Sequence, residues 1–243
     1  MFLKFLGTGS GFCVDKGNNC AYFKEDDKIL FLDFGDSTFE RVISQGLLND
    51  VNHVYVAVTH LHGDHAGGLG SLCLYDTFAK NTVTNLVQSD DYSKDSFLMQ
   101  YLILQGCGGL YTFSGSGLDD RFKTIKSVKF EKVTHVQPID SYAIEIGLAD
   151  GRTIFYSGDT NDEQYIKSVV DRLKPKDEFY CDCCLADYVG NVHTNVEKLK
   201  RLVPYEKRKQ VYMMHLDNDK LYELADEYGF QVAYAEEKGK QMQ

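Results

Sequence analysis

A short segment with three histidines and an aspartate has the residue types of a metal site. The segment is Thr59-His60-Leu61-His62-Gly63-Asp64-His65, and it follows the apolar run Val54-Tyr55-Val56-Ala57-Val58. A β-branched run that stops at a polar, glycine-containing segment indicates a buried strand that ends in a loop. Side chains two residues apart at a strand end point to the same side. His60 and His62 could therefore bind one ion.

The end of the same segment could serve a second ion. Asp64 and His65 follow Gly63, which lets the chain curl. The alternatives are a cluster of surface histidines or a structural site for a single ion. All histidines except His53 fall at predicted strand ends or directly before a predicted helix, which favours a site built from loops at one edge of a sheet. His53 is expected to be structural or exposed. The six are His60, His62, His65, His135, His193 and His215.

The segment His60-Leu61-His62-Gly63-Asp64-His65 resembles the H-x-H-x-D-H signature of the metallo-β-lactamase superfamily. The resemblance implies an α/β fold, a four-layer αββα sandwich with two pseudo-symmetric halves. It also implies a centre for two divalent metal ions. The ligands that it implies are His60, His62, His135 and Asp159 for the first ion, and Asp64, His65, Asp159 and His215 for the second, with Asp159 bridging both.

Such a ligand set favours hydrolysis. Imidazole and carboxylate groups suit Zn²⁺ and would also accept Mn²⁺ or Fe. Two ions about 3.5–4 Å apart can activate water and polarise a phosphoryl or carbonyl oxygen. The resemblance implies that Asp64 orients the nucleophile or accepts its proton. His193 is not needed as a ligand and is a candidate acid that stabilises charge on the leaving oxygen. The alternative for His193 is a histidine exposed to water at a helix start.

Strands and helices alternate along the chain, which indicates a layered α/β architecture. Strands are predicted at residues 3–6, 19–23, 29–34, 54–58, 83–88, 128–133, 142–146, 153–156, 179–187, 211–214 and 231–234. Helices are predicted at residues 38–45, 69–79, 92–104, 162–173, 196–202 and 221–228. Residues 29–37 and 152–160 are both apolar strands that end in Gly-Asp-hydroxyl before a helix. This repetition predicts two similar halves that face each other.

Three local patterns refine these elements. Gly46 is expected to cap the helix at residues 38–45. Thr194-Asn195-Val196-Glu197 has the form of a capping box before the helix at residues 196–202. The glycine-rich segment Gly7-Thr8-Gly9-Ser10-Gly11 could line the floor of a pocket beside the metal centre. Within Thr82–Leu118, the loose glycine- and serine-rich residues 105–117 could be a mobile lid over the site or an ordinary surface connection.

Length and composition set broader limits. The 243 residues contain no linker, and we expect a single domain at residues 1–243. The absence of a signal sequence and of long apolar runs predicts a soluble, cytoplasmic protein without a membrane association. Seven cysteines in such a chain are expected to be reduced. In Cys181-Asp182-Cys183-Cys184 the thiols either pack inward from a strand or form a further metal site.

Several segments resemble the RNase Z-like phosphodiesterase branch of the superfamily. They are Phe5–Gly11, Asn18-Asn19, Tyr156–Thr160 and His193-Thr194. The chain lacks the inserted arm that grips tRNA, residues 216–219 lack that branch's basic and aromatic side chains, and a glutamate expected before His193 is at best replaced by Asp187.

These departures, the net charge of −10 and a pI near 5.1 argue against a long nucleic acid as substrate. We therefore expect a phosphodiesterase that acts on a small phosphodiester such as a cyclic nucleotide. The alternatives are hydrolysis of a thioester, lactone or β-lactam, cleavage of tRNA 3′ ends in the manner of RNase Z, or a metal-binding sensor. A homodimer is compatible with the sequence.

Overall fold

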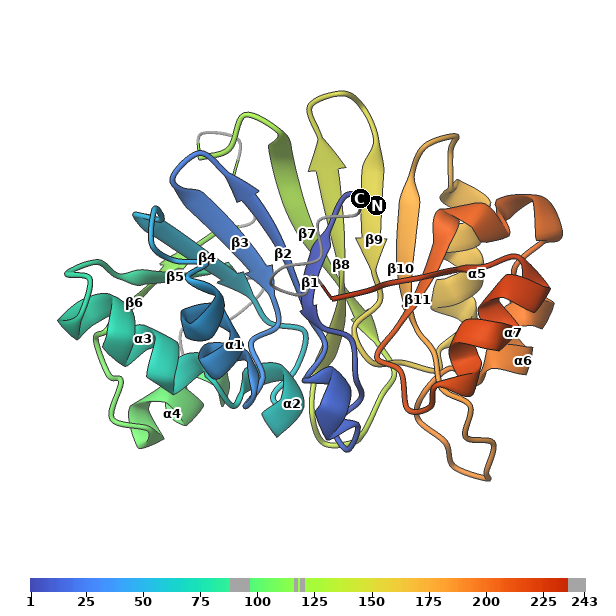
Figure 1. Ribbon diagram of the computed structural model, residues 1–243, viewed down its shortest axis with the longest axis horizontal. Coiled ribbons are helices and arrows are strands. Elements are labelled where there is room, and N and C mark those ends of the chain that lie inside the picture. Colours follow the sequence, from blue (N-terminus) through green and yellow to red (C-terminus); the bar gives the residue numbers. More distant parts are fainter. Residues whose placement is uncertain (88–96, 116–117, 119–120, 236–243) are drawn as a thin grey trace.

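Two six-stranded sheets form the centre of the protein (Figure 1). The computed structural model describes residues 1–87, 97–115, 118 and 121–235. The first sheet contains, in spatial order, β1 (Lys4–Gly7), β2 (Cys20–Glu25), β3 (Lys28–Leu32), β4 (His53–Ala57), β5 (Thr84–Val87) and β6 (Tyr111–Ser114). The second has the order β12-β11-β10-β9-β8-β7. Its strands are β7 (Ile125–Val133), β8 (Ser141–Leu148), β9 (Thr153–Tyr156), β10 (Glu178–Asp182), β11 (Val211–Met214) and β12 (Gln231–Val232).

The two sheets repeat one strand pattern. In the first sheet, β1, β2 and β3 are antiparallel, and β3 to β6 are parallel. In the second sheet, β7, β8 and β9 are antiparallel, and β9 to β12 are parallel. The prediction of two pseudo-symmetric halves is therefore confirmed. Because β4, β7, β9, β10 and β11 run in the corresponding directions, their carboxyl ends meet at one edge of the molecule.

Alternation of side chains along the strands separates three apolar layers. In β3, Leu30 and Leu32 belong to the layer between the sheets, together with Ile144 and Tyr156 of the second sheet. The intervening Ile29 and Phe31 pack on the other face, under the helices of the first half. A third layer lies between the second sheet and its helices. Three cores between four layers confirm the predicted αββα sandwich.

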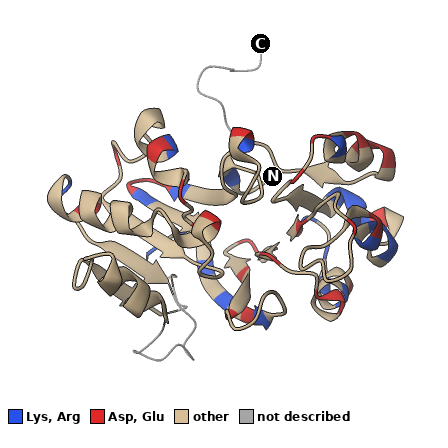
Figure 2. Ribbon diagram, turned by 90° about the horizontal axis from the view of Figure 1, so that it is seen from below, with Lys and Arg blue, Asp and Glu red and all other residues tan. Residues whose placement is uncertain are grey.

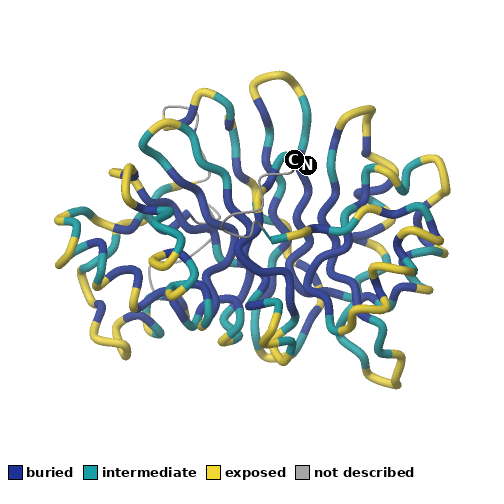
Figure 3. The backbone as a smooth tube through the Cα atoms, viewed as in Figure 1, coloured by how far each residue is buried: buried dark blue, intermediate teal, exposed yellow. Residues whose placement is uncertain are grey.

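The helices cover the outer faces of the sheets (Figure 1). Those of the first half are α1 (Thr38–Gln45), α2 (Gly63–Ala66), α3 (Leu69–Phe78) and α4 (Phe97–Leu104), and those of the second are α5 (Glu163–Arg172), α6 (Val196–Leu202) and α7 (Lys220–Tyr228). Two 3₁₀ helices, η1 (Val14–Lys16) and η2 (Tyr205–Gln210), complete the list. Figure 3 shows buried strands at the centre and exposed loop tips around them. None of the helices in the described residues has both the length and the apolar character needed to span a bilayer.

The local predictions fared unequally. Gly46 caps α1 in the left-handed conformation, with φ 66°, as predicted. The capping box before α6 was wrong, because Asn195 is the N-cap and accepts the backbone N–H of Glu197, while the hydroxyl of Thr194 donates to the carbonyl oxygen of Thr160. Strand β10 ends at Asp182 rather than at residue 187. The three clustered cysteines are buried, as the inward-packing interpretation requires.

The region expected to be loose contains a strand. Residues 111–114 form β6, which pairs in parallel with β5 at the edge of the first sheet. The predictions of a strand end at residue 88 and of a helix over residues 92–96 lie outside the described residues, as does part of the proposed lid. Helix α4 begins at Phe97 within the predicted range.

Candidate metal centre

The seven candidate ligands converge at the edge where the carboxyl ends of the strands meet. His60 and His62 follow β4, and Asp64 and His65 lie in the short helix α2. His135, Asp159 and His215 follow β7, β9 and β11 of the other sheet. Each half of the sandwich thus contributes to one cluster, and the structure brings together all residues that the sequence nominated as ligands.

One group of donors surrounds the position expected for the first ion. His60, His62, His135 and Asp159 each offer a ligand atom within 4.8 Å of the others. Nε2 of His60 lies 2.9 Å from Nδ1 of His62, and Nε2 of His135 lies 3.4 Å from the same Nδ1. Three imidazoles and a carboxylate in this arrangement match the preferences of Zn²⁺ and similar ions.

A second group shares Asp159 with the first and contains Asp64, His65 and His215. Oδ2 of Asp159 lies 3.2 Å from Nε2 of His65 and 3.3 Å from Nε2 of His215. Oδ2 of Asp64 lies 3.4 and 3.2 Å from the same two nitrogens. Asp159 thus belongs to both groups.

The outer nitrogen of His65 is held by a carboxylate, as is usual for a metal ligand. Nδ1 of His65 lies 2.8 Å from Oδ2 of Asp33, which is completely buried. Asp33 also accepts hydrogen bonds from the backbone N–H of Thr59 at 2.7 Å and from the hydroxyl of Tyr156 at 3.2 Å. Such contacts fix the ring so that its Nε2 points into the site.

Two further atoms test whether the cluster fits cations. Nε2 of His65 and Oδ1 of Asp159 are buried and have no hydrogen-bond partner among the described residues. A buried polar atom left in this state is costly unless another group satisfies it. Divalent cations would satisfy both atoms, so the donor set can hold divalent metal ions.

The histidines of the cluster differ in the direction in which their pKa values are shifted. Burial lowers the pKa of His60 well below its usual value and also lowers that of His135, so both rings are neutral and able to coordinate. Burial would also lower the pKa of His215, but the carboxylates of Asp159, Asp182 and Asp64 outweigh it and raise the value to about 10. This part of the site therefore strongly favours positive charge.

His193 lies beside the cluster and is paired with an aspartate. Its Nδ1 is 2.9 Å from Oδ2 of Asp182, which is completely buried at the end of β10. Oδ1 of Asp182 lies 3.5 Å from Nδ1 of His215, so one carboxylate faces both rings. The side chain of His193 is partly exposed to the cavity. Asp187, the nearest match to the glutamate expected before His193, is exposed, and the carboxylate that contacts His193 is that of Asp182.

The cluster opens into a cavity of about 580 Å³. Ser10 and Gly11 line it, which agrees with the prediction that the glycine-rich segment borders the site. A Cβ atom at Gly11 would lie only 2.9 Å from Oδ2 of Asp64. The lining contains four aspartates and, among the described residues, no lysine or arginine. The aspartates are Asp36, Asp64, Asp159 and Asp217.

Sequence reasoning missed the two carboxylates that hold the histidines. Asp33 directly follows β3 and Asp182 ends β10, so each lies at the edge that carries the ligands. A buried aspartate at the end of an apolar strand was the available signal. His53, expected to be structural or exposed, is exposed at the start of β4, away from the cluster.

Comparisons with known proteins agree with this architecture. A profile of the family described as anti-Pycsar protein Apyc1 matches residues 1–237. The anti-Pycsar protein Apyc1 of Bacillus phage BSP38 is 24% identical over an alignment of 234 residues, and the match covers 88% of this chain and 88% of that one. The metallo-β-lactamase fold protein YhfI from Bacillus subtilis superposes with a TM-score of 0.69 at 16% identity, over 96% of this chain and 95% of that one. Human tRNase Z, short form, gives 0.64 at 16% identity, over 98% and 97%. The fold is therefore the metallo-β-lactamase fold.

Proposed function

Because the chain belongs to the anti-Pycsar protein Apyc1 family, we propose that it is a metal-dependent phosphodiesterase that hydrolyses a cyclic nucleotide. Proteins of this family degrade cyclic nucleotides. The observation that carries the proposal for this chain is the cluster of seven histidine and aspartate side chains from both halves, which opens into one cavity. The expectation of a small phosphodiester, drawn from the sequence, agrees with this membership.

The proposed ligands divide into two sets that share Asp159. His60, His62 and His135 would hold one ion, and Asp64, His65 and His215 the other. Zn²⁺ is the proposed metal, because imidazole predominates among the donors, with Mn²⁺ or Fe as substitutes. When bound, two such ions supply Lewis acidity toward the phosphoryl group and a nucleophile that is available at neutral pH.

Two side chains of the protein would accept and donate protons in the proposed reaction. Asp64 lines the cavity and is the most exposed carboxylate of the two ligand sets, so its second oxygen can orient the attacking water or accept its proton. His193 is proposed as the acid that donates a proton to the leaving oxygen. Geometry supports this role, because the His193 ring lines the cavity while Asp182 fixes its Nδ1 and leaves Nε2 available.

The charge of the cavity favours a small, singly charged substrate. Four aspartates line it without a lysine or arginine among the described residues. Figure 2 views the molecule from this edge and shows acidic and basic residues interspersed over α5, α6 and α7. A long nucleic acid needs clustered cations along its track. A cyclic nucleotide carries one negative charge, which the proposed ions could meet without further cations.

The experiment is a substrate panel with a matched pair of variants. Purified protein loaded with Zn²⁺ or Mn²⁺ is tested on 3′,5′-cyclic nucleotides, on bis(p-nitrophenyl) phosphate, and on thioester, lactone and β-lactam substrates. We expect turnover of the cyclic nucleotides, lost on chelation and restored by metal. Asp64→Ala is expected to lower kcat by about 100-fold or more. Asp171→Ala, which removes an exposed carboxylate from α5, serves as the control. Turnover confined to the acyl substrates would refute the proposal.

A further inference from the structure

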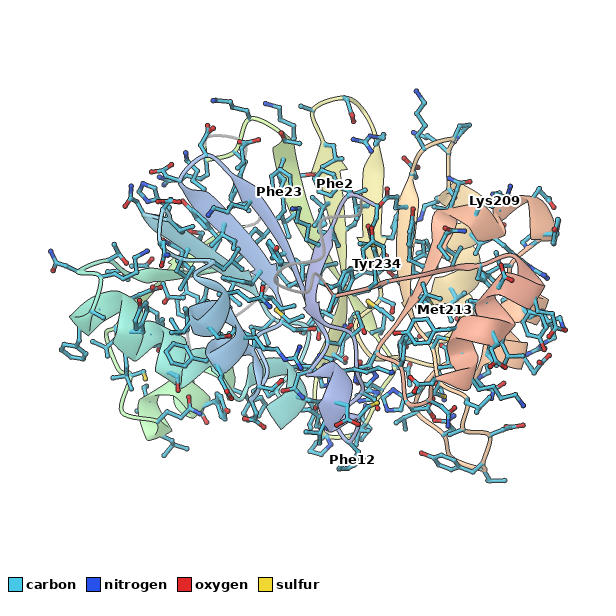
Figure 4. All side chains as sticks on the ribbon, in the orientation of Figure 1. Phe2, Phe12, Phe23, Lys209, Met213 and Tyr234 are labelled. Atoms are coloured by element: carbon cyan, nitrogen blue, oxygen red, sulfur yellow. The ribbon has the colours of Figure 1, made fainter. Side chains whose placement is uncertain are left out.

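An aromatic ring stands in solvent at the mouth of the cavity. Phe12 lines the cavity, and its side chain is fully exposed, at 101% of the reference value. Figure 4 labels it at the lower edge of the molecule, where the loops that follow the strands gather. Burial of a phenylalanine ring normally stabilises a fold. Folding therefore gives no reason for a phenylalanine at this position.

The loop that carries Phe12 is braced against the proposed ligands. The backbone N–H of Cys13 donates to the carbonyl oxygen of Ser10 at 2.9 Å and closes a turn around Gly11 and Phe12. Gly11 packs so closely on Asp64 that a Cβ atom would lie 2.9 Å from its Oδ2. The ring is consequently attached one residue away from a contact with the metal centre, on a turn with an internal hydrogen bond.

A second aromatic side chain borders the same cavity from another loop. Tyr188 lies between β10 and α6, and 59% of it is exposed. The backbone N–H of Asn191 donates to the carbonyl oxygen of Tyr188 at 3.1 Å, and the Asn191 side chain donates to the carbonyl oxygen of Ala186 at 2.9 Å. Asp217 accepts the N–H groups of Leu185 and Ala186 at the base of the loop. This wall of the cavity is also braced.

We propose that Phe12 binds the base of the nucleotide by stacking, with Tyr188 as a second aromatic wall of the same base site. The inference rests on the proposed function. The phosphate end of the cavity is polar and carries His62, Asp64, His193 and His215. A volume of about 580 Å³ leaves room for a nucleoside beyond the phosphate. Every base presents a π face, and an aromatic side chain can bind it without reading its edge.

The test separates stacking from simple apolar contact. Phe12→Ala, Phe12→Leu and Phe12→Trp are compared with Phe78→Ala, which removes an exposed ring at the end of α3. Kinetics are measured on a 3′,5′-cyclic nucleotide and on 1-deoxyribose 3′,5′-cyclic phosphate, which lacks the base. We expect Phe12→Ala to raise the KM for the nucleotide by roughly 5- to 100-fold with a smaller change in kcat. The preference for the nucleotide over the base-free substrate should fall by the same factor.

The other variants give the signature of stacking. Phe12→Trp should restore the low KM, whereas Phe12→Leu should behave like Phe12→Ala, because leucine is apolar but has no π face. Binding of the cyclic phosphate of 2-aminopurine riboside to metal-loaded protein, recorded before turnover, should quench its fluorescence more strongly with native Phe12 or with Phe12→Trp than with Phe12→Leu, in which only Tyr188 remains to stack. Phe78→Ala should match the unaltered protein in both assays.

Four outcomes would overturn the inference. In the first, Phe12→Leu retains the native KM, which would assign the ring a purely apolar role. In the second, Phe12→Ala slows both substrates equally. In the third, Phe12→Ala changes the oligomeric state in gel filtration, which would place the ring in a subunit contact. In the fourth, the unaltered protein hydrolyses no cyclic nucleotide and does not quench the fluorescence of the 2-aminopurine nucleotide. Failure of turnover alone, with quenching retained, would count against the proposed function but not against the base site.

Discussion

Replacement of Asp182 by asparagine should weaken both metal binding and catalysis through one buried position. The carboxylate accepts at Oδ2 from Nδ1 of His193 and from the backbone N–H of Thr160 at 3.0 Å, and its Oδ1 faces Nδ1 of His215. An amide has one oxygen. If that oxygen keeps the contacts of Oδ2, its NH₂ group faces His215 and favours the tautomer whose Nε2 carries a proton. That tautomer cannot bind a metal ion through Nε2.

The size of the effect follows from these contacts. Loss of a group that orients a metal-bound histidine typically costs 10- to 100-fold in metal affinity or activity, or about 1.4–2.7 kcal/mol. Burial lowers the pKa of His193, but Asp182 more than offsets it and raises the value. Asp182→Asn removes this charge, so a further loss of kcat is expected even at saturating metal. The overall fold should persist, since the amide oxygen still accepts from Thr160.

The assay measures metal affinity by competition with a chelating dye and kcat at saturating metal. Asp187→Asn is the matched control, because this exposed aspartate lies in the following loop and is not a member of the cluster. In a His193→Ala background, Asp182→Asn should still weaken metal binding but lose its additional effect on kcat. Native metal affinity and kcat in Asp182→Asn would refute the reasoning, as would equal effects from Asp187→Asn.

Two further predictions concern stability. Asp33→Ala leaves the donors of Thr59 and His65 buried without their acceptor, so urea denaturation should show a loss of about 3 kcal/mol or more in the free energy of unfolding. Asp226→Ala on the surface should cost far less. Equal losses in the two variants would contradict the role of Asp33 as a buried acceptor. Burial raises the pKa of Asp76, whose Oδ1 has no hydrogen-bond partner among the described residues. Because the folded-state pKa lies above the unfolded one, its stabilising contribution is present at low pH and is lost as the pH rises through the folded-state value. Compared with the unaltered protein, Asp76→Asn should therefore raise the urea midpoint more at pH 7.5 than at pH 4.5. A midpoint lowered equally at both pH values would argue against a buried charge.

The clustering of the nominated ligands follows from where they lie relative to the strands. His60, His62, Asp64 and His65 lie in one segment after β4, and His135, Asp159 and His215 each follow another apolar strand, so strand direction brings them to one edge. The repeated strand-to-helix pattern at residues 29–37 and 152–160 likewise predicted the architecture of two similar halves.

The partners of those ligands could not be predicted in the same way. The carboxylate that contacts His193 is that of Asp182 at the end of β10, a strand that stops earlier than its apolar composition indicated. Strand β6 was missed because it lies in a glycine-rich segment and its formation depends on pairing with β5. Asn195 and Thr194 both suit an N-cap, and the choice between them depends on a distant carbonyl oxygen, that of Thr160. In each case a tertiary contact decides between locally equivalent alternatives.

The division of the ligands between the two sheets has a thermodynamic consequence. With ions held as proposed, His60 and His62 of one half and Asp159 and His215 of the other bind the same pair of cations. Neither half could form the site alone, so the free energy of metal binding is also free energy of association between the halves. The ions would therefore hold the two halves of the sandwich together at one edge. Exchange of backbone amides at that seam would then depend on the concentration of free metal.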